Sequence, residues 1–300
     1  MSNQCNRRDF FKWTANLGLA AAVSRSVFAS ESTDRQSNWP IGCFTRPWDK
    51  YDYRVALDAI AEAGFKHAGL MTCNSKTSLI ITFETTPEEA QQIGEEVKKR
   101  GLEVPAVYGG GFPMQPTIQT GIDALRKLID RCAAVKGKTL MMGGVEAPEL
   151  YEPYYKIISE CCDYAESKKV GLTLKPHGGS NATGPQCRKS IEKVGKNNFT
   201  LWYDPGNIFY YSKGELNPIL DAPSVDGIVT GMCVKDYLPP QNVMVTPGEG
   251  KVDFPAVFSL LKKGGFARGP VVIETLAPGS QAEILAQAKK AKQFVESFVG

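Results

Sequence analysis

Histidine is scarce in this sequence, and the cysteines are not arranged as metal ligands. Two histidines in 300 residues are too few for a histidine-rich cluster of zinc ions. The eight cysteines never have the CxxC spacing that is typical of a structural zinc site. Without Cys5, which lies close to the N-terminus, seven cysteines remain, and an odd number cannot pair fully in disulfides. We therefore expect most cysteines to be small, buried apolar residues.

An excess of charge and long apolar runs are also missing. The formal net charge is +3, and the first 29 residues account for all of it. The neutral remainder gives no indication of binding to nucleic acid. The apolar run at 17–23 is too short for a stable membrane anchor. No GxGxxG motif follows the first expected strand, at 41–45, so a dinucleotide-binding fold lacks its main support.

The N-terminal segment has the features of an export signal. Residues 6–12 (NRRDFFK) resemble a twin-arginine motif, and the apolar run at 17–23 precedes a small-residue end at Ala29. We expect a twin-arginine-type signal peptide over residues 1–29, cleaved after Ala29, and a short linker over 30–39. The twin-arginine export machinery, which carries folded proteins, is then the expected export partner. The expected location is the periplasm or the exterior of a bacterial cell.

Strands and helices alternate regularly over residues 40–300. Each expected strand is a short apolar run, and each is followed by a segment with helical periodicity. Parallel strands need such crossovers, and eight of them in about 260 residues fit a closed barrel better than an open sheet. We therefore predict an α/β fold with a single (β/α)8 TIM barrel over 40–300. The expected strands are at 41–45, 67–72, 104–108, 139–142, 171–174, 199–203, 229–234 and 271–273, and the expected helices are at 53–63, 87–100, 118–135, 148–169, 186–194, 215–220, 254–263 and 281–298.

Four expected strands in the second half of the chain end on a charged residue. The residues that directly follow these apolar runs are Lys175, Asp204, Lys235 and Glu274. The carboxyl ends of all strands in a TIM barrel meet on one face, which carries the active site. We therefore expect the four side chains to belong to one site. His177 belongs with them, because it lies two residues beyond Lys175 in a Pro-His-Gly-Gly turn.

The segments around these strand ends resemble a known family. They are LKPH (174–177), YDPGN (203–207), CVKDY (233–237), PGEGKVDF (247–254) and VIE (272–274). Together they resemble the xylose isomerase-like TIM barrels that are grouped as sugar phosphate isomerases and epimerases. The resemblance implies a carbohydrate substrate and the interconversion of ketoses by moving a proton next to a carbonyl group. It also implies one divalent cation, held by Glu, Asp, His and Glu at the ends of strands five to eight.

The ligand set that the resemblance implies is incomplete in this chain. Asp204 and Glu274 occupy the two matching acidic positions, whereas Lys175 replaces the fifth-strand Glu. Cys233 replaces the seventh-strand His. A protonated amine cannot bind a cation, and a thiolate prefers softer metals than carboxylates do. A rearranged site with Mn, Zn, Mg or Fe is one interpretation, and a site without metal is the other; the candidate metal ligands are Asp204, Glu274, His177 and Cys233.

Three functions are consistent with these residues. The first is a sugar isomerase or epimerase, in which Glu274 transfers the proton and Lys175 or a cation holds the carbonyl oxygen. Asp204 and His177 then orient that electrophilic group. The second is a barrel that binds a sugar without turnover. The third is an aldolase or lyase in which Lys175 forms a Schiff base, and Lys175 also fits a structural ion pair with Asp204.

Further candidates lie near the same strand ends. The polar residues that are expected to bind the substrate are Glu146, Asn207, Lys235 and Asp236. The aromatic residues that are expected to offer a face to a sugar are Trp48, Tyr108, Tyr210 and Tyr211. Two of the polar candidates, Lys235 and Asp236, also fit a solvated pair at the start of a loop. The expected ligand is a small carbohydrate, and the sequence is compatible with an oligomer.

Metal analysis of the folded protein separates the two kinds of site. Stoichiometric Mn, Zn or Fe in the purified protein is expected for the rearranged ligand set. A metal-free protein that still turns over a sugar is expected if Lys175 takes the place of the cation. Inductively coupled plasma mass spectrometry measures the metal content. Metal-free protein that binds sugars without turnover would support the binding interpretation instead.

Overall fold

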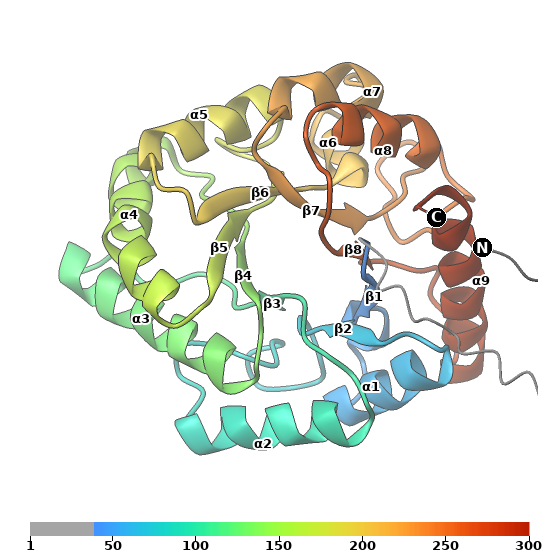
Figure 1. Ribbon diagram of the computed structural model, residues 1–300, viewed down its shortest axis with the longest axis horizontal. Coiled ribbons are helices and arrows are strands. Elements are labelled where there is room, and N and C mark those ends of the chain that lie inside the picture. The colour runs from blue at the N-terminus through green and yellow to red at the C-terminus, as the bar shows by residue number, and fades with distance from the viewer. Residues whose placement is uncertain (1–38, 300) are drawn as a thin grey trace, which may run out of the picture. The chain divides into compact units, whose positions relative to one another are not determined.

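Eight parallel strands alternate with helices in the computed structural model, which describes residues 39–299. The strands form a ring that the helices surround (Figure 1), so the predicted TIM barrel is confirmed. The strands are β1 (Ile41–Phe44), β2 (His67–Gly69), β3 (Val107–Tyr108), β4 (Thr139–Met142), β5 (Gly171–Leu174), β6 (Phe199–Tyr203), β7 (Val229–Val234) and β8 (Val271–Ile273). The α-helices are α1 (Tyr53–Glu62), α2 (Pro87–Lys99), α3 (Ile118–Ala134), α4 (Tyr151–Ser167), α5 (Gly184–Val194), α6 (Pro205–Tyr211), α7 (Pro218–Asp221), α8 (Phe254–Lys263) and α9 (Gln281–Val299). Short 3-10 turns are η1 (Arg46–Trp48), η2 (Pro148–Leu150) and η3 (Ala222–Val225).

The barrel is closed by a short, irregular contact between β2 and β3. The other neighbouring strands pair in the order β2-β1-β8-β7-β6-β5-β4-β3. Between β2 and β3, Leu70 N donates to Ala106 O at 3.0 Å, and Tyr108 N donates to Leu70 O at 2.8 Å. Pro105 has no N–H group for a regular ladder. As a result β3 is only two residues long, shorter than the expected strand at 104–108.

The helix after β6 begins earlier than the sequence analysis predicts. Asp204 caps α6, because its side chain accepts a hydrogen bond from Asn207 N at 2.9 Å and Pro205 follows at the first helical position. The helix expected at 215–220 is confirmed only in its second half, because α7 begins at Pro218 and ends at Asp221. The end of β6 and the start of α6 are therefore joined without a loop, which holds Asp204 in place.

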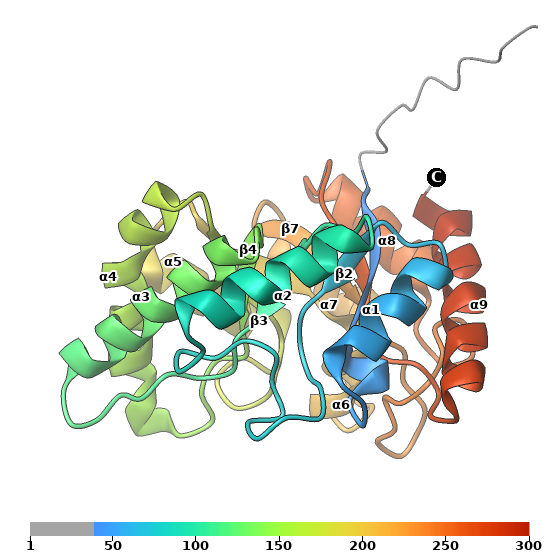
Figure 2. The ribbon, with the colours of Figure 1, turned by 90° about the horizontal axis from the view of Figure 1, so that it is seen from below.

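Apolar side chains fill the inside of the barrel below a layer of charged ones. A separate cluster of buried apolar residues consists of Phe44, Met71, Ala106, Met141, Trp202, Cys233 and Val272. Side chains alternate along a strand, so the residue two positions after an inward side chain also points inward. This rule places Asp204, Lys235 and Glu274 one pleat beyond the apolar residues of β6, β7 and β8. The carboxyl ends of the strands lie on the side of the barrel that carries α6 (Figure 2).

The cysteines of the described residues behave as apolar side chains. All seven, from Cys43 to Cys233, are buried and free of disulfides. Burial raises the pKa of several of these thiols, for example that of Cys162 to about 12, so they stay protonated near neutral pH. The expectation of small, buried cysteines is confirmed.

The expected export signal lies outside the residues that the structure describes. This holds for all of residues 1–29 and for all but the last residue of the linker expected at 30–39. The twin-arginine signal and the periplasmic location stay predictions. Between residues 39 and 299, none of the helices has the length and apolar character needed to cross a membrane.

Replacing Trp202 should test the importance of the inner apolar cluster. The indole packs against Gly231, where an added Cβ atom would lie 2.3 Å from the ring. We expect Trp202→Ala to lower the free energy of unfolding by about 3–5 kcal/mol, because the smaller side chain leaves a cavity. Leu220→Ala is the control, since Leu220 is 76% exposed and its loss should cost less than about 0.5 kcal/mol. Urea denaturation followed by circular dichroism measures both, and equal costs would contradict the expectation.

Candidate active site

The ends of β5, β6, β7 and β8 bring four charged side chains into contact. Lys175 Nζ lies 2.5 Å from Glu274 Oε2 and 3.1 Å from Asp204 Oδ2. Lys235 Nζ lies 2.6 Å from Glu274 Oε1 and 3.1 Å from Asp204 Oδ2. Each lysine therefore bridges both carboxylates. All four side chains are buried, so the charges interact with little screening by water.

Arg46 is a fifth member of this group, and the sequence analysis missed it. Its Nη1 donates a hydrogen bond to Glu274 Oε1 at 2.8 Å. Arg46 opens the 3-10 turn η1 directly after β1, so the signal in the sequence was a charged residue just beyond the end of a strand. We call the five residues the ion cluster: Arg46, Lys175, Asp204, Lys235 and Glu274.

The ion cluster shifts the pKa values of its members in different directions. Burial alone would raise the pKa of Glu274, but the charges of Lys175, Lys235 and Arg46 hold it well below its usual range. Burial alone would lower the pKa of Lys175, but Glu274 and Asp204 raise it above its usual value. For Lys235 burial is the larger effect, and its pKa is lowered.

Lys235 has the surroundings of an ammonium group despite its lowered pKa. Three oxygen atoms lie close to its Nζ: Glu274 Oε1 at 2.6 Å, Asp204 Oδ2 at 3.1 Å and Asn207 Oδ1 at 3.1 Å. Two of these oxygens belong to carboxylates, whose negative charges favour the ammonium form, and the third accepts a hydrogen bond from Lys235. The ion cluster thus contains three cations and two carboxylates.

Asn207 positions the ion cluster. Its side chain accepts a hydrogen bond from Lys235, and its Nδ2 donates to Pro176 O at 2.6 Å. Its backbone N–H donates to Asp204 Oδ1 at 2.9 Å. Asn207 therefore links the ends of β5, β6 and β7. Because it is only 3% exposed, its amide supports the two charged residues rather than an open surface.

Asp236 serves a loop instead of the ion cluster. It follows the inward Lys235 by one position, so its side chain points away from the barrel interior. Its carboxylate accepts four hydrogen bonds of 2.8–3.1 Å, which come from the backbone N–H groups of Tyr237, Gly248, Gly250 and Val252. These four donors leave no free edge for a sugar. The alternative of a solvated Lys235–Asp236 pair is wrong, because both side chains are buried.

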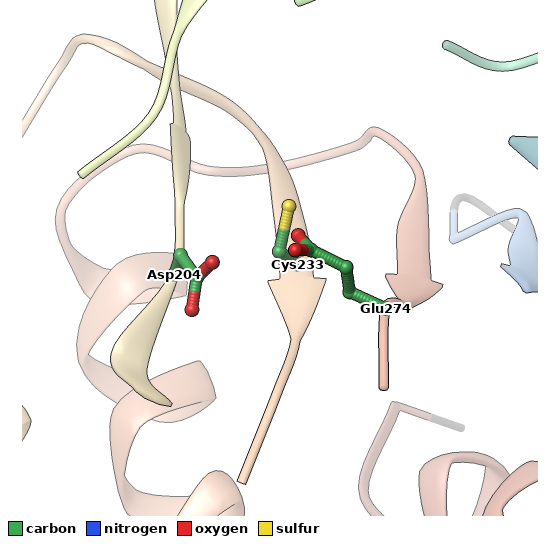
Figure 3. A group of neighbouring side chains, drawn as sticks. All are labelled: Asp204, Cys233 and Glu274. Atoms are coloured by element: carbon green, nitrogen blue, oxygen red, sulfur yellow. The ribbon is translucent and has the colours of Figure 1, made fainter. Parts of the chain in front are cut away.

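One group of side chains has the spacing of metal ligands. The ligand atoms of Asp204, Cys233 and Glu274 all lie within 4.8 Å of one another, and the three side chains point towards a common centre (Figure 3). Two ammonium groups, however, already contact both carboxylates. Burial raises the pKa of the Cys233 thiol well above its usual range, so a cation would have to displace its proton as well as the two ammonium groups. With these residues in their charged forms, the group does not fit a divalent cation.

A cavity beside the ion cluster contains the candidate His177. Its volume is about 170 Å³. Burial and the charges of Lys175 and Lys235 lower the pKa of His177 to about 4, so the imidazole is neutral near pH 7. Glu146 lies at the same cavity, as the sequence analysis proposed. The residues that line it are Tyr108, Gly110, Gly111, Gly143, Gly144, Val145, Glu146, Tyr154 and His177.

Two of the four aromatic candidates lie near His177. The ring centroid of Tyr211 is 5.5 Å from that of His177, and the centroid of Tyr108 is 6.5 Å away. Tyr210 packs against the edge of Tyr211 with centroids 5.1 Å apart. Trp48 is 1% exposed and is therefore part of the packing around the barrel. Tyr108 and Tyr211 remain as aromatic faces for a ligand.

Known proteins match most of this chain in sequence. The family model described as xylose isomerase-like TIM barrel matches residues 57–297. An inosose dehydratase of Salmonella agona (strain SL483) is 21% identical over 247 residues. That match covers 71% of this chain and 81% of the dehydratase.

Solved structures share the fold. A xylose isomerase domain protein from Planctomyces limnophilus has a TM-score of 0.67 and 20% identity, with 87% of this chain and 97% of that chain covered. A D-allulose 3-epimerase from Methylomonas sp., solved in complex with D-allulose, has a TM-score of 0.67 and 16% identity, with 87% and 98% covered. At these identities the likeness establishes the fold, and the reaction must be inferred from the site.

Removing one lysine should destabilise the barrel far more than removing a lysine from the surface. We expect Lys175→Met to lower the free energy of unfolding by about 3–5 kcal/mol, because it leaves buried carboxylate charge without a partner. Lys290→Met is the matched control, since Lys290 pairs with Glu249 at an exposed site and such pairs contribute less than about 1 kcal/mol. Urea denaturation at neutral pH measures both variants. Equal losses would mean that the ion cluster does not stabilise this end of the barrel.

Proposed function

Because the chain belongs to the xylose isomerase-like TIM barrel family, we propose that it is an isomerase or epimerase of a small carbohydrate. The reaction moves a proton on the carbon next to the substrate's carbonyl group. A D-allulose 3-epimerase is among the proteins that share the fold. The cavity volume of about 170 Å³ also favours a small substrate, because sites for drug-sized ligands span roughly 300–1,000 Å³.

One observation carries this proposal: a neutral imidazole faces a cavity beside fixed positive charges. We assign His177 as the base, because its imidazole lines the cavity and is neutral near pH 7, so that a ring nitrogen can accept a proton there. Negative charge then develops on the carbonyl oxygen, which needs a fixed positive group nearby. The ammonium groups of Lys175 and Lys235 are buried beside the cavity and act on this charge through space, as they do on the pKa of His177.

The carboxylates have a supporting role in this mechanism. Glu274 is contacted by three cations, which hold its pKa well below its usual range. Glu274 is fully buried and does not line the cavity that contains His177, so the proposal departs from Glu274 as the base. Glu274 and Asp204 instead fix the two ammonium groups in position. Every step uses residues of this chain, and none is routed through a metal ion.

The surroundings of Lys175 argue against Schiff-base chemistry. A lysine that attacks a carbonyl group must be neutral. Two carboxylates contact Lys175 Nζ and raise its pKa. A barrel that binds a sugar without turnover remains the second candidate, since the ion cluster is buried. Turnover distinguishes it from the proposed enzyme.

Exchange of substrate hydrogen with solvent deuterium tests the role of His177. With D-allulose, D-fructose and D-tagatose as probes, the wild-type protein should exchange the hydrogen next to the carbonyl group, and His177→Gln should slow this by about 100-fold or more. His67→Gln is the matched control, because His67 starts β2 at the opposite end of the strand. Both rates are measured by proton NMR. Unchanged exchange in His177→Gln would remove this residue as the base.

The pH profile gives a second test of the same assignment. The pKa of His177 is lowered to about 4, so the base is lost by protonation only when the pH falls through about 4. We expect the exchange rate to be constant from about pH 8 down to about pH 5 and then to decrease. A decrease centred near pH 6.5, the usual pKa of histidine, would contradict the lowered value.

A further inference from the structure

The ion cluster carries one positive charge more than its carboxylates balance. Arg46, Lys175 and Lys235 contact Asp204 and Glu274, and the exposed Asp49 adds a weaker interaction with Arg46. Buried charges are normally paired, because a buried ion without a partner costs several kcal/mol in real proteins. The two buried lysines balance the two carboxylates, so the additional positive charge lies on Arg46, the member that is partly exposed. An additional anion at the site would balance it.

Arg46 is the member of the ion cluster that is open to a ligand. Its side chain is 31% exposed, whereas the side chains of the two lysines are 1–2% exposed. Of its guanidinium nitrogens, Nη1 bonds to Glu274. Within residues 39–299, no partner of Nε or Nη2 is found. The guanidinium group is thus held at one nitrogen and keeps an edge with two donors free.

Neutralising Glu274 does not require Arg46. The two ammonium groups of Lys175 and Lys235 already lie 2.5 and 2.6 Å from the Glu274 oxygens. Glu274 instead fixes the orientation of the guanidinium group, which reduces the entropy that a ligand must overcome on binding. An arginine that is held in this way presents a planar pair of donors, which matches the two oxygens of a carboxylate or phosphate.

We propose that Arg46 binds an anionic group of the substrate, so that the preferred substrate is an acidic sugar. The group is a carboxylate or a phosphate ester, which share the oxygen pair that a guanidinium edge recognises. The rest of the sugar extends along Tyr108, which lines the cavity and interacts electrostatically with Arg46 and Lys175. This inference takes the reaction of the substrate from the proposed function. The binding of an anion is argued from Arg46 and does not depend on that reaction.

Three ligands that differ in one group test this inference. D-fructose, D-fructuronate and D-fructose 6-phosphate differ only at the carbon that carries a hydroxyl, a carboxylate or a phosphate ester. We expect at least one acidic ligand to bind roughly 10- to 100-fold more tightly than D-fructose. Isothermal titration calorimetry on the full chain measures the three dissociation constants. The ligand with the larger preference identifies the anionic group.

Variants of Arg46 separate the anion site from a structural role. Arg46→Gln should reduce the preference for the acidic ligand to less than about 3-fold while D-fructose affinity changes little. Arg46→Lys keeps the charge and the pairing with Glu274 but loses the planar edge, so it should retain only part of the preference. Arg54→Gln is the control, because it removes the same charge from the exposed start of α1. Circular dichroism verifies that each variant is folded.

The outcomes distinguish this inference from the proposed function. Equal affinity of the wild type for all three ligands would overturn the anion site, as would an equal loss for acidic and neutral ligands in Arg46→Gln. Deuterium exchange is measured on the same ligands. If acidic ligands bind through Arg46 but none exchanges hydrogen, the anion site stands and the isomerase proposal fails. If D-fructose exchanges equally in wild type and Arg46→Gln and acids bind no better, the anion site fails alone.

Discussion

The pairing of two buried carboxylates with two lysines is the interaction on which the site face of this barrel depends. Charges cannot be buried singly without a large cost in free energy, so Asp204 and Glu274 require partners at that depth. Lys175 and Lys235 bridge both of them. The bridges connect the ends of β5, β6, β7 and β8, and they leave cations where the family resemblance implies a metal ion.

This pairing determines what chemistry the neighbouring groups can perform. Burial and the fixed ammonium groups lower the pKa of His177 and keep its imidazole neutral. The same lysines and Arg46 contact the carboxylate of Glu274, which does not line the cavity. In the proposed enzyme His177, in the cavity, accepts the proton, and the lysines of the ion cluster stabilise the negative charge. In the proposed enzyme, binding of an acidic sugar at Arg46 would add the negative charge that the cluster lacks.

Much of the fold could be predicted from the sequence because strand and helix periods are local properties. The eight strands and the charged residues at four strand ends were found in this way. The short β3 and the early start of α6 were not, since they depend on Pro105 and on the cap at Asp204. Arg46 was missed because it lies in the 3-10 turn after β1 and not directly at the strand end, as Glu274 does. Asp236 was misjudged because its partners, such as Gly250, come from a distant loop.

By itself the sequence determined the barrel and the identity of the residues at the ends of its strands. Only the tertiary structure decided which charges became partners, because these pairs join residues far apart in the chain. Lys175 and Glu274 are separated by 99 positions, and Arg46 and Glu274 by 228. Charge interactions depend on distance and on burial, and neither quantity is encoded in a local pattern. The protonation states that define this site therefore appear only once the barrel is closed.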